Sequence, residues 1–315
     1  MLLDIIIIIV GIAMVLWGAD KMTEGAVAVA ERFGISQIVI GLTVVACGTS
    51  MPELCVSLVS ALKGTSDLAV GNVVGSNIFN TMLIVGVAAA ITPITILRNT
   101  VKKDIPFALV ASVVLTLMCL DHNIARWEAA ILLCMFGFFM WMTLKGAKQE
   151  NSSPASDSSS EGKKKPALGR AILLILIGIF CLIYGSNIFV DAAVDVATTL
   201  GVSEAVIGLT IVACGTSLPE LATTVVAARK GNSGIAIGNV LGSNVFNILM
   251  ILSVTGLITP MQINGITMLD LSVLTGSIFL LWYLSFTKLT IERWEGWLLS
   301  ILFITYLSYL VWQVA

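Results

Sequence analysis

Residues 39–54 read VIGLTVVACGTSMPEL, and residues 206–221 read VIGLTIVACGTSLPEL. This stretch decides the fold, because each copy places a carboxylate, Glu53 or Glu220, inside a strongly apolar segment. An ionisable group in such a segment is costly, so it is a functional candidate by default. Each copy also has Gly and Pro on either side of Thr-Ser, which predicts a local break in an otherwise helical run.

The composition places the chain in a membrane. Hydrophobic residues make up 57% of the chain and charged residues 11%, whereas soluble domains carry about 25% charged residues. The sequence has no basic stripe that would favour nucleic acid. The six cysteines all fall in apolar runs without a CxxC pair, which indicates small buried residues rather than a disulfide framework. With His122 as the single histidine, a multi-His metal site and its enzymes are excluded.

The apolar runs predict an all-α polytopic membrane protein with ten transmembrane helices. Most runs approach the ~20 residues that cross a bilayer. The first lacks a basic leading segment, so we expect a retained span rather than a signal peptide. The predicted spans are 3–19, 37–62, 68–91, 104–120, 127–144, 169–187, 204–228, 235–258, 268–286 and 294–312.

The chain is a duplication. The two halves match at a constant offset of 167, so that GNVVGSNIFN at 71–80 corresponds to GNVLGSNVFN at 238–247. Such internal repeats are common in transporters. We therefore predict one five-helix repeat over 1–145 and a second over 168–315. Their motif regions are 39–80 and 206–247.

Residues 146–167, GAKQENSSPASDSSSEGKKKPA, predict a flexible linker between the halves, because they are rich in Ser, Gly and Lys. Five spans per half is an odd number, so the second half must insert upside down relative to the first. If the N-terminus lies outside, all 17 basic residues except Lys63 and Arg126 fall on the cytoplasmic side. The positive-inside rule then predicts a cell-membrane protein with both termini outside and a cytoplasmic linker.

The break in each repeated stretch predicts a cation site. Pro52 has no N–H, and its ring clashes with the carbonyl four residues back, so carbonyls from Ala46 to Gly48 should be freed near the bilayer midplane. Free carbonyls are tolerated there only if protein, water or a cation covers them. Beyond the break, Thr49 and Glu53 are four residues apart and Ser50 lies between them, so all three can face one point.

The motif GNVVGSNIFN predicts a polar stripe on a helix, because Asn72, Ser76 and Asn80 are spaced by four residues. The second copy repeats the stripe. Asn77 and Asn244 point elsewhere and are expected to bond between helices. Such residues also serve as packing contacts between membrane helices, and that alternative stays open.

The pooled donors are hard oxygen atoms, which suit Ca²⁺ or Na⁺ rather than Zn²⁺ or Cu²⁺. Glu53 and Glu220 give a formal charge of −2, which one Ca²⁺ or two Na⁺ would balance. Two close carboxylates without an ion should not both stay ionised, so we expect protons to compete for the site. The opposite possibility, a buried structural Glu, is weakened by the symmetry of the two copies.

The motifs GTSMPE, GTSLPE, GNVVGSNIFN and GNVLGSNVFN resemble the two repeats of the sodium/calcium exchanger family, within the cation/Ca²⁺ exchanger superfamily. The resemblance covers nearly the whole chain outside the linker, and the chain is similar in size to the compact prokaryotic members. It implies an antiporter of ten helices with a pseudo-two-fold axis in the membrane plane. The first and sixth spans would slide across a rigid core.

The resemblance also implies the ligands. Glu53 and Glu220 would be the shared carboxylates, and Ala46 and Ala213 would supply carbonyls at Na⁺ positions. Hydroxyl, carbonyl or amide oxygens would come from Thr49, Ser50, Thr216, Ser217, Ser76, Asn80, Ser243 and Asn247. Some members, including the potassium-dependent branch, carry Asp where this chain has Asn247, so potassium independence is expected.

The predicted function is Na⁺/Ca²⁺ exchange by alternating access, with the two ions as substrates in a lipid bilayer and no cofactor. No protein partner is evident. An H⁺/Ca²⁺ antiporter of the same superfamily is the close alternative, although abundant hydroxyl and carbonyl donors favour Na⁺. A passive cation channel is a second alternative, but inverted repeats with broken midplane helices favour a transporter. An intramembrane enzyme lacks a nucleophile–base pair.

Overall fold

Helices make up nearly all of this computed structural model, which describes residues 2–150, 167–200 and 213–314. The π-helical and 3₁₀ turns within them are labelled η. The elements of the first half are α1 (Leu2–Phe33), α2 (Gln37–Ile40), η1 (Gly41–Val45), α3 (Ala46–Thr49), α4 (Met51–Leu62), α5 (Ser66–Ile78), η2 (Phe79–Ile84), α6 (Val85–Ile91), β1 (Ile94–Thr95), η3 (Thr100–Asp104), α7 (Ile105–Met118), η4 (Cys119–Asp121), β2 (Asn123–Ile124) and α8 (Arg126–Glu150).

The second half repeats these bounds. For example, α4 and α12 both begin two residues before their glutamate, and both run for 12 residues. The described elements of this half are α9 (Leu168–Thr199), α11 (Ala213–Thr216), α12 (Leu218–Arg229), α13 (Ser233–Val245), η6 (Phe246–Ile251), α14 (Leu252–Ile258), β3 (Met261–Gln262), α15 (Met268–Lys288), β4 (Thr290–Ile291) and α16 (Arg293–Val314).

The protein is a polytopic helical membrane protein, as the composition predicts. In the described ranges, 8 helices are long and apolar enough to cross a membrane. Gln37–Thr49 and Met51–Leu62 bend by 47° relative to each other and make a ninth span if the pair is counted as one. The predicted seventh span, 204–228, lies partly outside the described residues, and its described part forms α11 and α12.

Two predicted spans end too early. The apolar runs 3–19 and 169–187 end where charged or polar residues begin, but α1 continues to Phe33 and α9 to Thr199. The reason is that Asp, Lys and Glu interrupt an apolar run without interrupting a helix, since most of these residues have adequate helix propensity. Both helices therefore extend well beyond their apolar part.

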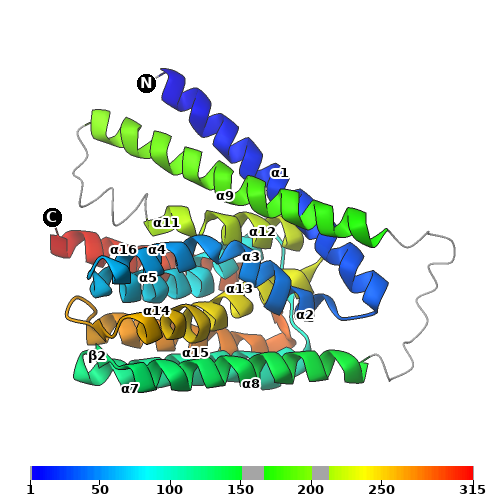
Figure 1. Ribbon diagram of the computed structural model, residues 1–315. Helices are drawn as coiled ribbons and strands as arrows, with labels where there is room; N and C mark the ends of the chain where they lie inside the picture. The colour runs from blue at the N-terminus through cyan, green and yellow to red at the C-terminus, as the bar shows by residue number, and fades with distance from the viewer. Residues whose placement is uncertain (1, 151–166, 201–212, 315) are drawn as a thin grey trace.

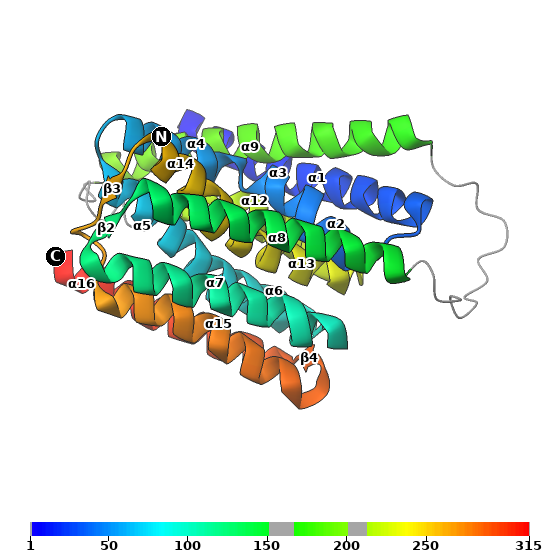
Figure 2. The ribbon, with the colours of Figure 1, turned by 60° about the horizontal axis from the view of Figure 1, so that its bottom comes forward.

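Helices α1 and α9 pack against each other along their length and lie across the other helices (Figure 1). Glycines permit this close approach: a Cβ atom added at Gly178 would lie 2.7 Å from the backbone nitrogen of Met22. Turning the molecule brings α7, α8 and α15 forward on the opposite side (Figure 2). The pair α1–α9 thus forms a separate layer over the remaining helices.

The connections between helices gather at two ends of the bundle. At one end β1 pairs antiparallel with β4, and at the other end β2 pairs antiparallel with β3. We call these the β1/β4 end and the β2/β3 end. The pairing is reciprocal, because β3 and β4 are the second-half equivalents of β1 and β2. Hydrogen bonds follow the same rule: Ile96 N donates to Leu289 O at 2.7 Å, and Ile263 N donates to His122 O at 2.8 Å.

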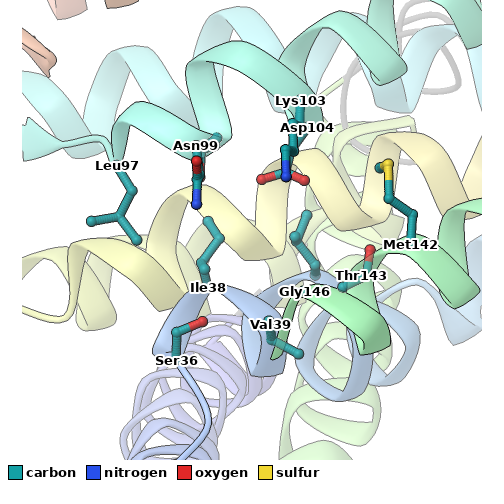
Figure 3. A pocket seen from close by; sticks show the side chains of 12 residues that line it. Ser36, Ile38, Val39, Leu97, Asn99, Lys103, Asp104, Met142, Thr143 and Gly146 are labelled. Atoms are coloured by element: carbon teal, nitrogen blue, oxygen red, sulfur yellow. The ribbon is translucent and has the colours of Figure 1, made fainter. Parts of the chain in front are cut away.

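A cavity of about 270 Å³ lies between the start of α2–η1, the turn η3 and the end of α8 (Figure 3). It is at the β1/β4 end, because η3 follows β1 directly and α8 begins at the β2/β3 end. It is separate from the two glutamates, neither of which lines it.

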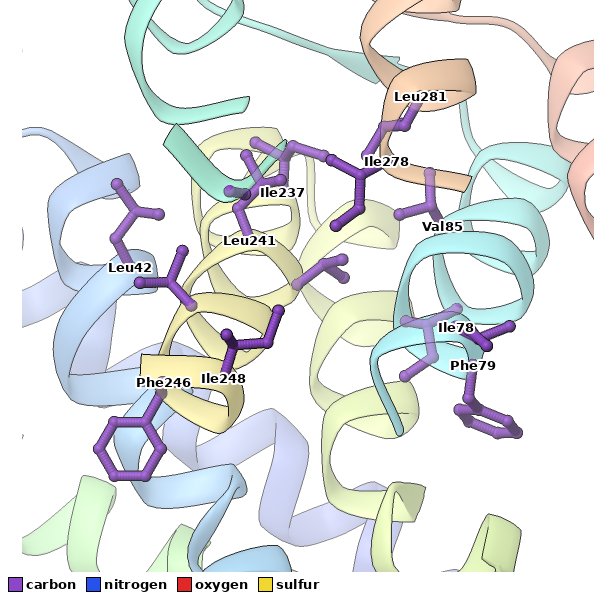
Figure 4. Packing of buried hydrophobic residues seen from close by; sticks show 14 of the residues in the cluster. Leu42, Ile78, Phe79, Val85, Ile237, Leu241, Phe246, Ile248, Ile278 and Leu281 are labelled. Atoms are coloured by element: carbon purple, nitrogen blue, oxygen red, sulfur yellow. The ribbon is translucent and has the colours of Figure 1, made fainter. Parts of the chain in front are cut away.

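The core is centred on the two spans that carry the GNV motifs. In an apolar window of 18 residues within each span, 94% of the window is buried in Ser233–Ile258 and 72% in Ser66–Ile91, compared with 22% in Leu3–Phe33. Large apolar side chains of these spans, such as Leu241 and Ile78, pack with Leu42 and Ile278 (Figure 4). The motifs are therefore held in a buried, close-packed part of the described chain.

Candidate cation site

The predicted break is present in both copies. Ser50 separates α3 from α4 with φ −82° and ψ 10°, and Ser217 separates α11 from α12 with φ −92° and ψ 8°. Each serine is followed by a helix whose first turn contains the proline. Proline has no N–H to donate backward but fits the first turn of a new helix, so the chain stops one helix and starts another.

The two glutamates are buried and meet at one site. Ser217 Oγ donates to Glu53 Oε1 at 3.0 Å, and Ser50 Oγ donates to Glu220 Oε1 at 2.9 Å. Each carboxylate is thus held by the serine of the other copy. Both glutamates are 0% exposed and lie in the first turn of their helices, where the helix dipole favours a negative charge.

Several buried oxygens around these contacts have no hydrogen-bond partner among the described residues. They are Glu53 Oε2, Glu220 Oε2, Thr216 Oγ1, Ser243 Oγ, Asn80 Oδ1 and Asn247 Oδ1. A buried polar atom without a partner is destabilising unless a ligand satisfies it. Carboxylate, hydroxyl and amide oxygens are the donors that Na⁺ and Ca²⁺ take. The chemistry of this set therefore fits a hard cation.

The GNV spans bring their residues to the same place. Ser76 Oγ lies 3.2 Å from Ser217 Oγ, within hydrogen-bond distance. The turn η2, which carries Asn80, packs against α12, and η6, which carries Asn247, packs against α4. Ser243 follows Gly242, where an added Cβ would lie 2.7 Å from the Cβ of Ala46. Each half therefore contributes its asparagine to the glutamate-bearing helix of the other half.

We expected the carbonyl of Ala46 to be free of hydrogen bonds, but in this structure it accepts one from the helix backbone. Ala46 O accepts from Ser50 N at 3.0 Å and lies 3.3 Å from Thr49 Oγ1. The reason is that the helix continues to Thr49, so that the carbonyl left without an i+4 donor by Pro52 is that of Gly48. Ala213 begins α11 at the edge of the described residues.

The side-chain amide nitrogen of Asn72 contacts the glutamate-bearing helix of its own half. Its Nδ2 donates to Glu53 O at 3.2 Å and to Ser57 Oγ at 3.0 Å. The equivalent bonds in the second half run from Asn239 Nδ2 to Glu220 O and Thr224 Oγ1, at 3.3 Å and 3.0 Å. These asparagines therefore hold the glutamate-bearing helices in place through one bond to the backbone of the glutamate and one to a hydroxyl in the next turn.

Sequence reasoning missed Ser57, Thr224 and Thr81. Ser57 and Thr224 stand four residues after the glutamates in both halves, and this shared spacing is the signal that could have identified them. The expectation for Asn77 and Asn244 is confirmed. Asn244 Nδ2 donates to Thr81 Oγ1 at 2.7 Å, and Asn247 Nδ2 donates to Asn77 Oδ1 at 3.4 Å.

The described residues contain no group of three or more His, Cys, Asp or Glu side chains that could hold a metal ion. The cluster around Glu53 and Glu220 has two carboxylates, and its other donors are neutral oxygens. Low charge with many neutral oxygens suits an ion that is released again, because tight permanent sites usually add charge. The site is therefore of the kind expected for a transported ion.

Membrane-spanning helices with two buried carboxylates on broken helices define an ion-coupled membrane transporter. The chain belongs to the sodium/calcium exchanger family: the profile described as "Sodium/calcium exchanger protein" matches residues 3–145 and again residues 170–312. These two ranges are offset by 167, as are the two halves of the sequence. The family consists of cation/Ca²⁺ antiporters rather than enzymes.

Individual relatives are consistent with membership of this family. The chain is 36% identical over 267 residues to "Putative antiporter CaxA" of Alkalimonas amylolytica, with 84% of each chain covered. It is 32% identical over 341 residues to "Sodium/calcium exchanger MaX1" of Methanosarcina acetivorans, with 96% of this chain and 97% of that protein covered. The solved structure of the sodium-calcium exchanger NCX_Mj soaked with zero Na⁺ and Ca²⁺ is 31% identical, with a TM-score of 0.85 and coverage of 98% and 99%.

Proposed function

We propose that this protein exchanges Na⁺ for Ca²⁺ across the cell membrane at one site built from both copies. The observation that carries the proposal is the reciprocal pair of bonds from Ser50 to Glu220 and from Ser217 to Glu53. One site with a formal charge of −2 accepts either one Ca²⁺ or two Na⁺. Because the two ions use the same carboxylates, binding of one excludes the other.

The choice of Na⁺ rather than H⁺ rests on the donor set. A proton needs one carboxylate oxygen, whereas the site presents neutral hydroxyl and amide oxygens that have no partner among the described residues, such as Ser243 Oγ and Asn247 Oδ1. MaX1 and NCX_Mj are both named as sodium/calcium exchangers. We assign the ion ligands to Glu53, Glu220, Thr49, Thr216, Ser50, Ser217, Ser76, Ser243, Asn80 and Asn247, with the carbonyls of Ala46 and Ala213.

Ten spans in two inverted repeats, over 1–145 and 168–315, are part of the proposal. Two observations support it. The strand pairs and the serine–glutamate bonds are exchanged by the 167-residue offset, as a pseudo-two-fold axis requires. Among the described residues, Lys63 and Arg126 lie toward the β2/β3 end and the other basic residues toward the β1/β4 end.

By the positive-inside rule the β1/β4 end faces the cytoplasm, which places the linker 146–167 inside and both termini outside. Trypsin tests this orientation. In inside-out vesicles it should cleave at Lys163 to Lys165 and separate the two halves, and in right-side-out vesicles it should not. Cleavage from the outer side alone would reverse the assignment.

We further propose that α1 and α9 slide over the bends to alternate access. The bends present glycines to these helices: a Cβ added at Gly48 would lie 2.6 Å from Ile179 Cδ1 of α9, and one at Gly215 would lie 2.2 Å from Val190 Cγ2 of α9. The glycines let the α1–α9 layer approach the bends closely, so that a movement of this layer reaches the bends directly.

Uptake of ⁴⁵Ca²⁺ into proteoliposomes tests the function. An imposed Na⁺ gradient should drive uptake, and a pH gradient alone should not. Glu53→Gln and Glu220→Gln should each abolish uptake, because one remaining carboxylate cannot balance Ca²⁺. The matched control is Glu31→Gln on α1, a glutamate distant from the site, which should transport normally.

Other outcomes separate the alternatives. Uptake driven by the pH gradient alone would identify an H⁺/Ca²⁺ antiporter, and single-channel currents would identify a channel. Potassium independence, expected from Asn247, is tested in the same vesicles: co-transport of K⁺ with Ca²⁺ would contradict it. Normal exchange by either glutamine variant would show that the site is elsewhere.

A further inference from the structure

A second cavity, a groove with a volume of about 340 Å³, lies between the α1–α9 layer and helices α6 and α12. α12 packs against both helices of this layer (Figure 1). The described residues that line the groove are all apolar, and they include Ile12 and Leu16 of α1 and Leu221 and Ala222 of α12. The proposed exchange of ions uses none of these side chains.

The corresponding corner of the first half is covered by protein. A Cβ atom added at Gly48, beside the bend at Ser50, would lie 2.6 Å from Ile179 Cδ1 and 3.2 Å from Met22 Cε. Met22 is 0% exposed. One side chain from each helix of the α1–α9 layer therefore packs directly onto the first bend.

The counterparts of these two side chains are placed differently in the second half. The offset of 167 makes Ile12 and Phe189 the equivalent pair, and both line the groove. The three atoms nearest to a Cβ added at Gly215 all belong to Val190. A corner that side chains fill in the first half is thus open in the second half.

An open groove of this composition favours an apolar guest. Water does not fill an apolar cavity, because it finds no hydrogen-bond partners there. Side chains that face an empty space lose their dispersion contacts on that side, and protein interiors contain few voids larger than a water molecule. Hydrocarbon in the groove would restore these contacts without any polar partner.

The groove lies at the depth of lipid acyl chains. Ile12 stands eight residues after Asp4 and eight residues before Asp20, the acidic residues that bound the apolar stretch of α1. It is therefore ~12 Å along the helix from either one, near the middle of a hydrocarbon layer ~30 Å thick. Ile12 is 45% exposed and Leu16 is 50% exposed, so the groove is continuous with the lipid-facing surface of α1.

We propose that the groove binds one acyl chain of a phospholipid from the surrounding bilayer. The chain enters beside Ile12 and Leu16 and packs against Leu221 and Ala222 of α12. The headgroup does not contribute to this contact, because the lining offers no polar side chain. Hydrocarbon then fills the second corner, as protein side chains fill the first.

Photo-labelling of the full chain in proteoliposomes tests the proposal, with a phosphatidylcholine that carries a diazirine in the middle of one acyl chain. Mass spectrometry of the peptides should find the label at Val15 and Ala222, which line the groove and are 6% and 7% exposed. A lipid that lies only on the surface does not reach such side chains. Ile175 of α9 is the matched control, because it is 7% exposed but does not line the groove and should stay unlabelled.

A variant that fills the groove should exclude the chain. Ala222→Leu adds a larger side chain to the lining and should reduce labelling of Val15. Each methylene that leaves an apolar site weakens binding about fourfold, so the displacement of about two methylenes should reduce labelling more than tenfold. Val225→Ala enlarges the groove and should keep the labelling. Phe138 of α8, which is exposed, should be labelled in every folded variant.

Absence of the label from Val15 and Ala222 in the unaltered protein, with Phe138 labelled, would overturn the proposal, because the groove would then be closed to lipid. Equal labelling of Ile175 would also overturn it. So would an Ala222→Leu variant that is labelled at Val15 like the unaltered protein. Each readout is lipid labelling, so the result is independent of whether the protein exchanges Na⁺ for Ca²⁺.

Discussion

Removing the hydroxyl of Ser217 should weaken Ca²⁺ binding by a calculable amount. In the structure this hydroxyl donates to Glu53 Oε1 at 3.0 Å inside a fully buried site. A hydrogen bond to a charged group contributes about 1.5–3 kcal/mol, which corresponds to about a 10- to 150-fold change in affinity. Ser50→Ala should have an effect of the same size, because Ser50 Oγ lies 2.9 Å from Glu220 Oε1.

The assay is the Ca²⁺ dependence of Na⁺-driven ⁴⁵Ca²⁺ uptake. Both serine variants should raise KM for Ca²⁺ and keep a measurable maximal rate, unlike the glutamine variants of the glutamates. Ser112→Ala is the control, since Ser112 is equally buried but donates to Leu109 O of its own helix at 2.8 Å. A Ser217→Ala variant whose KM stays within about twofold of the unaltered protein would refute the reasoning, because a loss of even ~1.5 kcal/mol exceeds that.

Three further predictions concern pH, stability and conformation. Ca²⁺ affinity should fall as pH is lowered from about 8 to about 5, because protons neutralise Glu53 and Glu220 and compete with the ion. Isothermal titration calorimetry measures this affinity, and a dissociation constant that does not change over this pH range would contradict the prediction. Glu295→Gln should lower the free energy of unfolding by the ~0.3–1 kcal/mol of a charge at a helix N-terminus, and with it the midpoint of heat unfolding, since Glu295 Oε2 accepts from the backbone N–H of Glu292, the residue before α16, at 2.7 Å; KM for Ca²⁺ should not change. Asp20→Asn should favour movement of α1, because the Asp20 carboxylate pairs with Lys230, the residue that follows α12, at 2.5 Å; unchanged cross-linking between α1 and α12 would count against this.

The sequence alone predicts which residues form much of the site, but it does not predict which of them bond to each other. Two glutamates in apolar runs and a constant offset are enough to place both copies at one centre. They do not reveal that Ser50 binds the glutamate of the other copy, because a hydroxyl three residues before Glu53 can equally bond within its own copy. Asn72 shows a similar limit: regular spacing gives the face of a helix, but the neighbour on that face depends on packing.

The two copies also differ in ways that their sequence does not. CGTS is the same in both, yet Thr49 Oγ1 donates to Asn239 Oδ1 at 3.1 Å, whereas Thr216 Oγ1 has no partner among the described residues. Identical segments therefore make unequal contacts, because the residues packed around each copy differ. If the two halves exchange roles during the alternating access proposed above, Thr216 should pair with Asn72 and Thr49 should lose its bond to Asn239. A distance measurement between Thr216 and Asn72 in the presence of Na⁺ and of Ca²⁺ tests this, and the same distance under both conditions would contradict the exchange of roles.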